Sequence, residues 1–238
     1  MDKKIAYVTD AHLDEDFIKE QGIDSRKNWQ IILEDIASKN IKNVIYGGDF
    51  GEPESHNWFF DSLKDYNLSV TLGNHDEYSQ VIKHFENEQK GLNNELFYSY
   101  EDSHFKYIFL DSSSDTVSKA QIKWLTKEIE SSKNILLFIH HPVLEIESIV
   151  DKKFPLHNRD EIKSLLLQSG KKIRIYTGHY HLDYEIRFDN ILQITTPAVS
   201  YQVVQDPNEI ILNTNSFGYR IIELNGDEVF TQVIDFHS

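Results

Sequence analysis

The chain has 238 residues, of which 39 are acidic and 24 are basic, and its net charge at pH 7 is −15. This charge disfavours binding to nucleic-acid polymers or anionic membranes through a basic surface. Cysteine is absent, which excludes disulfides, thiolate metal ligands and cysteine nucleophiles. Any transition-metal site must therefore use nitrogen and oxygen ligands.

The length fits a single domain that covers residues 1–238. The first apolar run, at residues 5–9, is too short for a signal sequence or a membrane span. We therefore expect a cytoplasmic protein without a membrane segment.

The first half of the chain alternates between apolar runs and helical spacing. The apolar runs at residues 5–9, 44–46 and 68–72 predict buried strands. Apolar residues recur at helical spacing over residues 28–38 and again from Trp58 to Leu63, whereas the charged residues 13–27 predict a loop. Alternation of strand and helix favours parallel strands joined by right-handed crossovers.

The pattern changes after residue 97, where two apolar and aromatic runs within residues 97–110 predict adjacent strands of a second sheet. A capping-box pattern opens a predicted helix at residues 118–129. Buried strands follow at residues 135–139 and 173–177, with helical spacing between them from Ile162 to Leu166.

Two further segments complete the chain. Residues 143–158 lack periodicity and predict a loop over the site. After Tyr184 the chain is rich in strand-forming residues, and a turn at Asn225-Gly226 predicts a closing hairpin.

Polar side chains directly follow five of the predicted strands. They are Asp10 and His12, then Asp49, then Asn74-His75-Asp76, then His140-His141, and finally His179 and His181. Each cluster alone is also typical of ordinary turn or cap residues. Open α/β sheets bind their ligands at the carboxyl ends of the strands, so the five clusters together predict one shared site.

The pooled side chains offer seven oxygen or nitrogen ligands, namely Asp10, His12, Asp49, Asn74, His140, His179 and His181. Iron, manganese, zinc and cobalt all accept such ligands, and two ions could share the Asp49 carboxylate. Two ions could hold a bridging hydroxide and clamp a phosphoryl group for in-line attack. His75 would then be free to protonate the leaving oxygen, with Asp76 fixing its tautomer and His141 as the next candidate for the acid.

The order of these motifs resembles that of the calcineurin-like metallophosphoesterases, and the match extends over residues 5–181. The resemblance implies a four-layer α/β/β/α sandwich of two mixed sheets. It implies that the first metal is held by Asp10, His12, Asp49 and His181, and the second by Asp49, Asn74, His140 and His179. It also implies that His75 is the proton donor, and that the substrate contacts His12, Asn74, His75 and His179.

A narrower resemblance, to the bacterial class III cyclic nucleotide phosphodiesterases, rests on less specific stretches. These are Gly22-Ile23-Asp24-Ser25, Ser118 to Leu125, Leu156-His157-Asn158, Thr196-Pro197 through Gln202, and Phe217-Gly218-Tyr219-Arg220. The chain departs from the subgroup at Val143, where a second proline is usual, and in the stretch after Asp49, which reads Phe50-Gly51-Glu52-Pro53. Both departures lie near the expected pocket, so they bear on the substrate.

Hypotheses from two classes follow. The first is a phosphodiesterase with two metal ions that hydrolyses a small-molecule phosphodiester, with 3′,5′-cyclic AMP as the expected substrate and the nucleoside monophosphate as the product. Glycerophosphodiesters, other phosphodiesters and phosphomonoesters are the alternatives within that class. The second hypothesis is a non-catalytic scaffold that binds partners and keeps some of the ligands, and the complete ligand set argues against it. The sequence predicts no oligomeric state.

Overall fold

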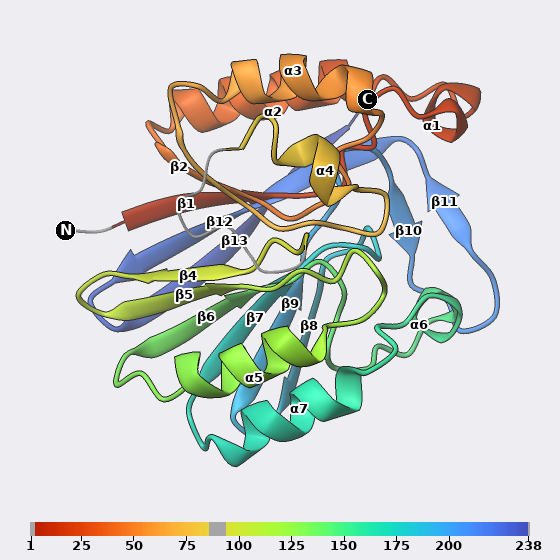
Figure 1. Cartoon of the computed structure of the whole chain (residues 1–238). Helices are drawn as coiled ribbons and strands as arrows, with labels where there is room; N and C mark the ends of the chain where they lie inside the picture. Colours follow the sequence, from red (N-terminus) through yellow and green to blue (C-terminus); the bar gives the residue numbers. More distant parts are fainter. Residues whose placement is uncertain (1–2, 86–93, 238) are drawn as a thin grey trace.

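A computed structural model describes residues 3–85 and 94–237 of the chain. Two β-sheets face each other in the middle of the molecule, and helices cover the outer face of each sheet (Figure 1). The layers therefore run helix, sheet, sheet, helix, and the predicted four-layer α/β/β/α sandwich of two mixed sheets is confirmed.

The first sheet has five strands in the order β13-β12-β1-β2-β3. Its strands are β1 (Lys3–Val8), β2 (Asn43–Tyr46), β3 (Asn67–Val70), β12 (Ser216–Asn225) and β13 (Glu228–His237). The three N-terminal strands are parallel, as predicted, and the C-terminal hairpin joins them antiparallel through β12.

The second sheet has six strands in the order β4-β5-β6-β7-β9-β8. Its strands are β4 (Tyr98–Glu101), β5 (Phe105–Phe109), β6 (Asn134–Phe138), β7 (Ile173–Thr177), β8 (Tyr184–Phe188) and β9 (Ile191–Thr195). The strands β5, β6, β7 and β9 are parallel, whereas β4 and β8 close the two edges antiparallel. The parallel strands of both sheets deliver their carboxyl ends to the same end of the sandwich.

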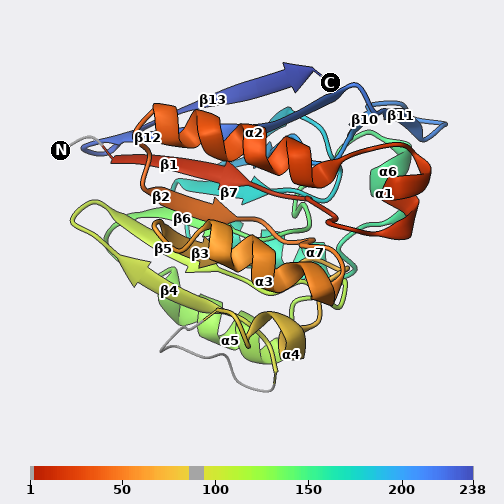
Figure 2. The same cartoon turned by 90° about the horizontal axis from the view of Figure 1, so that it is seen from above.

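Four longer helices form the outer layers (Figures 1 and 2). The helices α2 (Ser25–Ser38) and α3 (Pro53–Ser62) cover the five-stranded sheet, and α5 (Lys119–Glu128) and α7 (Arg159–Gln168) cover the six-stranded sheet. The Ser118 side chain accepts a hydrogen bond from the Gln121 amide at the start of α5, as the capping pattern predicts. Among the described helices, none combines the length and the apolar character that crossing a membrane requires.

Aromatic side chains fill the space between the two sheets. The Tyr7 ring of β1 lies 5.7 Å from the Phe138 ring of β6 and 6.0 Å from the Tyr176 ring of β7, measured between ring centroids. Phe138 and Tyr176 stack on each other at 5.3 Å. This core fixes the two sheets against each other and with them the strand ends that carry the polar clusters.

Three local predictions are wrong. The predicted loop at residues 13–27 contains the helix α1 (Asp16–Glu20) and the first turn of α2, and the predicted loop at residues 143–158 contains α6 (Ile149–Lys153). Five-residue helices span little more than one turn, so their sequences carry no detectable period. The hairpin turn is Gly226-Asp227, because β12 continues through Asn225.

A two-stranded ribbon lies outside both sheets, at the end of the sandwich that carries α1 and α6 (Figure 1). It consists of β10 (Gln202–Val204) and β11 (Ile211–Asn213), and its pairing places Val203 opposite Leu212. A third short helix, α4 (Tyr78–Val81), follows the end of β3.

Candidate metal centre

The five polar clusters that follow β1, β2, β3, β6 and β7 meet at one place, as predicted. Backbone hydrogen bonds tie their loops together: the Asp10 amide donates to the Gly48 carbonyl at 3.0 Å, and the His12 amide donates to the Asp49 carbonyl at 3.1 Å. Across the two sheets, the His179 amide donates to Oδ1 of the Asp10 carboxylate at 3.1 Å. The loops of both sheets therefore form one connected floor.

The backbone of this floor is unusual, because five of the seven predicted ligands have a positive φ angle. The angles are 58° at Asp10, 45° at His12, 58° at Asp49, 69° at His179 and 49° at His181. Residues with side chains seldom adopt this left-handed conformation, which costs about 1–3 kcal/mol per residue. Such outliers concentrate at functional sites, where the surrounding structure holds them in place.

Two glycines allow the loops to approach the buried carboxylates. A Cβ atom on Gly73 would lie 2.1 Å from Oδ1 of Asp49, and one on Gly178 would lie 2.4 Å from Oδ2 of Asp10. Neither distance is sterically allowed for a carbon atom. The glycines of the Gly-Asn-His-Asp and Gly-His-x-His motifs are therefore required by packing against the carboxylates.

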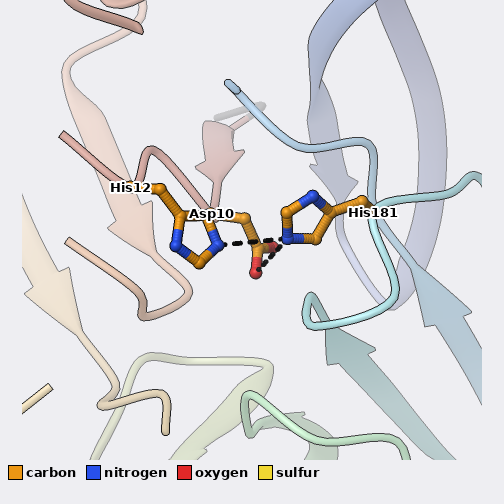
Figure 3. Close-up of side chains that lie close together, drawn as sticks. All are labelled: Asp10, His12 and His181. Atoms are coloured by element: carbon orange, nitrogen blue, oxygen red, sulfur yellow. Dashed lines mark hydrogen bonds and ion pairs between the residues drawn. The ribbon is translucent and has the colours of Figure 1, made fainter. Parts of the chain in front are cut away.

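Asp10, His12 and His181 form a first group of donor atoms that all lie within 4.8 Å of one another. Figure 3 shows both imidazole rings directed at the Asp10 carboxylate from opposite sides. The Nε2 atoms of His12 and His181 lie 3.2 Å apart, and the His181 Nε2 atom lies 3.3 Å from Oδ1 of Asp10. Three donor atoms thus converge on one point.

Asp49, His140 and His179 form a second group within the same 4.8 Å limit. The His140 Nε2 atom is buried and has no hydrogen-bond partner among the described residues, although it lies 3.2 Å from Oδ2 of Asp49. The same carboxylate oxygen lies 3.5 Å from the His12 Nε2 atom of the first group. Asp49 therefore lies between the two groups, which is the position that a shared ligand requires.

Hydrogen bonds from the opposite ring nitrogens orient the histidines. The Nδ1 atom lies 2.8 Å from the Gly47 carbonyl in His140 and 3.0 Å from the Tyr201 carbonyl in His181, so Nε2 faces the centre in both rings. In His179 the two ring nitrogens have the opposite roles. Its Nε2 atom lies 2.9 Å from the carbonyl of Phe154, so Nδ1 faces the centre. Such outer contacts fix the tautomer of a metal-binding histidine.

The charges of the centre compensate one another. Burial alone raises the pKa of Asp10, but the His181 and His140 rings lower it to about 2. Burial also raises the pKa of Asp49, but His140 and the other nearby rings hold it well below its usual range. Both carboxylates are therefore anionic, the state in which carboxylates bind cations. The buried Nε2 atom of His140, which lacks a hydrogen-bond partner among the described residues, lies beside the anionic Asp49 carboxylate. A set of nitrogen and oxygen donors of this kind fits transition-metal ions.

A cavity of about 390 Å³ opens above this floor. Its polar lining consists of His12, Glu15, Asp49, Asn74, His75, His179 and His181. The four residues predicted to contact substrate, His12, Asn74, His75 and His179, are all among them. Asp10 and His140 are fully buried and do not line the cavity.

Glu15 holds His75 at the mouth of the centre. The Oε1 atom of Glu15 lies 3.2 Å from Nδ1 of His75 and 2.9 Å from Nδ1 of His12. The hydrogen bond to Glu15 raises the pKa of His75 to about 9, against the opposing effect of burial. This hydrogen bond favours the protonated form of His75 and leaves its second ring nitrogen free of this contact.

The prediction that Asp76 fixes the tautomer of His75 is wrong. The two Asp76 carboxylate oxygens accept hydrogen bonds from the amides of Asp49 at 2.7 Å, Phe50 at 2.8 Å and Gly73 at 2.8 Å. A side chain one residue after His75 points into the loop, where it joins the ends of β2 and β3. Asp76 therefore supports the backbone around Asp49, and the hydrogen bond to the His75 ring comes from Glu15 instead.

His141 lies behind the centre. Its ring is buried, packs at 4.0 Å against the His179 ring, and has its Nδ1 atom 2.8 Å from the Ser112 hydroxyl and its Nε2 atom 3.1 Å from Asp115. It does not line the cavity. This position suits a support for His179 and does not suit a proton donor to substrate.

The departure from the subgroup pattern at Val143 has a physical reason. The Val143 amide donates to the Gln193 side-chain oxygen at 2.7 Å, and the Leu144 amide donates to the same oxygen at 2.6 Å. A proline at residue 143 could not donate this bond. Gln193 of β9 therefore anchors the loop that follows His140.

Glu15 is not among the residues that the sequence motifs predict for the site. It lies in a charged stretch that reads Leu13-Asp14-Glu15-Asp16, and nothing distinguishes it from its acidic neighbours. Its contact with His75 spans 60 residues of sequence. Only the placement of α1 beside the end of β3 brings the two side chains together.

Comparison with known proteins agrees with this geometry. A family model described as calcineurin-like phosphoesterase matches residues 3–213. A protein of Fibrobacter succinogenes, named as a probable cyclic nucleotide phosphodiesterase, is 28% identical over 239 residues, which cover 97% of this chain and 93% of the relative. A probable glycerophosphodiester phosphodiesterase of Arcobacter nitrofigilis is 29% identical over 177 residues, which cover 68% of this chain and 65% of that protein.

The solved structures include a dimetal phosphatase from Danio rerio with a similar chain path. Its TM-score is 0.64 at 14% sequence identity, and the match covers 96% of this chain and 98% of the other. At this identity the likeness concerns the fold alone.

Proposed function

The chain belongs to the calcineurin-like phosphoesterase family, and from this premise we propose that it is a phosphodiesterase with two metal ions that opens 3′,5′-cyclic nucleotides such as cyclic AMP. The family makes it a metal-dependent phosphoester hydrolase. The curated relative from Fibrobacter succinogenes, which matches nearly the whole chain, supports the cyclic nucleotide as substrate. The product would be the nucleoside monophosphate.

Seven residues would hold the two ions. Asp10, His12, Asp49 and His181 are proposed for the first ion, and Asp49, Asn74, His140 and His179 for the second. The two donor groups with Asp49 between them support this division. When bound, the ions would supply Lewis acidity toward the phosphate and an acidified water as nucleophile.

The chain itself would orient the phosphate and move a proton. Asn74, His75 and His179 line the cavity and can contact a phosphodiester that lies over the floor. His75 is the proposed general acid, because it lines the cavity and is held at Nδ1 by Glu15, which favours its protonated form. Its proton would go to the ribose oxygen that leaves phosphorus.

One observation carries the proposal: two compact donor groups that meet at Asp49 form the floor of a cavity whose lining also includes His75, held by Glu15. A scaffold that only binds partners has no need of this combination. Glycerophosphodiesters are the second candidate substrates, because the relative from Arcobacter nitrofigilis carries that name at 29% identity.

The test is a substrate panel. The purified chain is loaded with manganese, its metal content is measured, and hydrolysis of cyclic AMP, cyclic GMP, glycerophosphoethanolamine and p-nitrophenyl phosphate is followed. We expect cyclic nucleotides to have the highest kcat/KM. A protein that binds no metal and cleaves none of these compounds would support the scaffold, whereas a clear preference for the glycerophosphodiester would reassign the substrate.

A further inference from the structure

The cavity above the proposed metal centre has two unlike halves. Its polar lining residues are those of the site, whereas the other lining residues give it an apolar side. Two short helices supply the first part of this apolar side: Phe17 and Ile18 from α1, Val150 from α6, and Phe154, which directly follows α6. The residues Phe17 and Phe154 are 45% and 52% exposed, which is high for large apolar residues.

The β10-β11 ribbon supplies the rest of the apolar side. Val203 and Leu212, which pair across the ribbon, line the cavity together with Tyr201 and Ile210. We call these four residues, together with the four on the helical side, the apolar wall. Val150 and Val203 belong to a small buried cluster that also includes Tyr180, so the base of the wall is anchored next to His179.

Aromatic rings connect the apolar wall with the metal centre. The Tyr201 ring lies 4.4 Å from the ring of His181, and the Phe17 ring lies 6.0 Å from that of Tyr201 in an edge-on arrangement. A substituent of a phosphate bound over His181 would therefore meet Tyr201 first and Phe17 next. Pairs at these distances are typical of favourable aromatic contacts.

The apolar wall offers almost no hydrogen bonds to a ligand. Within the described part of the chain, the Tyr201 hydroxyl is the only side-chain hydrogen-bonding group among its eight residues. A glycerol or other polyol group placed there would lose its hydrogen bonds to water without replacement, which is unfavourable. An aromatic or aliphatic group would instead gain from burial.

On the basis of the proposed function, we propose that the substrates are phosphodiesters with an uncharged aromatic or aliphatic substituent, which binds to the apolar wall by contact and stacking. A nucleobase fits this description through its ring faces. Because the wall presents so few hydrogen-bonding groups, it does not distinguish bases by hydrogen bonds to their edges. Diesters of adenosine and guanosine therefore bind alike. Phe17, Phe154 and Ile210 are the residues that set this preference.

Two phosphonates test the apolar wall without any hydrolysis, because a carbon–phosphorus bond is not a substrate for a phosphodiesterase. Phenylphosphonate and 2-hydroxyethylphosphonate carry the same phosphonate head and differ in one substituent. Binding of each to the manganese-loaded protein is measured by calorimetry. We expect phenylphosphonate to bind about 10- to 100-fold more tightly, the range expected for burying one phenyl-sized group.

The double variant Phe17→Ser/Ile210→Ser should lose most of this difference while its metal content stays that of the wild type. Phe154→Ser is a second, independent variant, because the contact of residue 154 with His179 is made by its backbone carbonyl. The matched control is Phe230→Ser, since Phe230 on β13 is 56% exposed and does not line the cavity. It should keep the wild-type ratio.

Equal affinities for the two phosphonates in the wild type would overturn the proposal, and so would an unchanged ratio in both the double variant and Phe154→Ser. Failure of the proposed function gives a different result. In that case the protein would cleave no phosphodiester or would prefer the glycerophosphodiester, whereas the ratio of phosphonate affinities would still decide whether the wall selects apolar groups.

Discussion

The Glu15 carboxylate and the His75 ring form a pair whose Oε1 and Nδ1 atoms lie 3.2 Å apart. The same oxygen lies 2.9 Å from Nδ1 of His12, so one side chain orients both the proposed acid and a proposed metal ligand. This carboxylate belongs to none of the motifs by which the family resemblance was identified. The pKa of His75, the proposed acid, therefore depends on a residue outside these motifs.

Replacing Glu15 by glutamine should shift the pH dependence of hydrolysis. A general acid works only when it is protonated, so its rate falls as the pH rises through its pKa. Glu15 raises the pKa of His75 to about 9, and its neutral replacement should lower that pKa toward the ordinary value of about 6.5. The basic limb of the kcat/KM profile for cyclic AMP should therefore move to lower pH.

Glu15→Gln should also lower the activity at neutral pH. We expect about a 10-fold loss at neutral pH, as for other groups that orient a functional residue from outside. Glu15→Gln in a His75→Ala background should cost much less than in the wild type if the glutamate acts through His75. Equal losses in both backgrounds would indicate a role through His12 instead.

Replacing His75 by alanine should separate substrates by their leaving group. General acid catalysis contributes about 10²- to 10⁴-fold, so hydrolysis of cyclic AMP should fall within that range. The p-nitrophenolate ion leaves without protonation, so bis(p-nitrophenyl) phosphate should lose much less. Both ions should remain bound, and the basic limb of the pH profile should disappear. Equal losses on both substrates, or loss of an ion, would mean that the acid lies elsewhere.

Metal content should distinguish Asp49 from Asn74. The Oδ2 atom of Asp49 lies 3.2 Å from His140 and 3.5 Å from His12, so Asp49→Ala should remove activity and both ions together. Asn74→Ala should weaken mainly one ion, because Asn74 is proposed as a ligand of the second ion only. Elemental analysis after dialysis measures both variants. Two ions per chain in Asp49→Ala, or equal loss of both ions in Asn74→Ala, would contradict the assignment.

Replacing Asp151 by asparagine should destabilise the fold. Asp151 is buried, binds the Arg159 guanidinium through both oxygens at 2.8 Å, and accepts a hydrogen bond from the Tyr180 hydroxyl at 2.7 Å. Breaking a buried pair costs about 3–5 kcal/mol, and partial exposure of Arg159 reduces this to about 2–3 kcal/mol. Urea unfolding measures the loss.

The matched control for Asp151→Asn is Glu223→Gln, which breaks the exposed pair between Glu223 and Lys4. Exposed pairs contribute about 0–1 kcal/mol, so this variant should unfold close to the wild type. Similar destabilisation of the two variants would show that the Asp151 network contributes no more than a surface ion pair.

The sequence was most informative where short motifs follow strong strands. The apolar runs that end at Thr9, Tyr46 and Thr177 located the strand ends, and the topology of parallel strands then required their polar residues to meet. The family resemblance supplied the four-layer architecture. That a single domain covers residues 1–238 stays a prediction, as do the cytoplasmic location and the identity of the metals.

What the sequence could not supply depends on contacts between distant segments. The helices α1 and α6 are too short to give a period, yet they carry Glu15 and Val150 to the cavity. The role first assigned to Asp76 failed because adjacency in sequence says little about direction in a turn. Glu15, which is 60 residues away, occupies the place that was expected for Asp76.

The left-handed backbone at five of the proposed ligands has an evolutionary consequence. Each of these residues lowers folding stability whether or not the protein hydrolyses anything. If selection for hydrolysis were relaxed, glycine or asparagine would be favoured at Asp10, His12 and His181, since both tolerate positive φ. Asn74 and His140 have no positive φ and would gain nothing of this kind. Inactive descendants should therefore lose the strained ligands first and keep Asn74 and His140 longest.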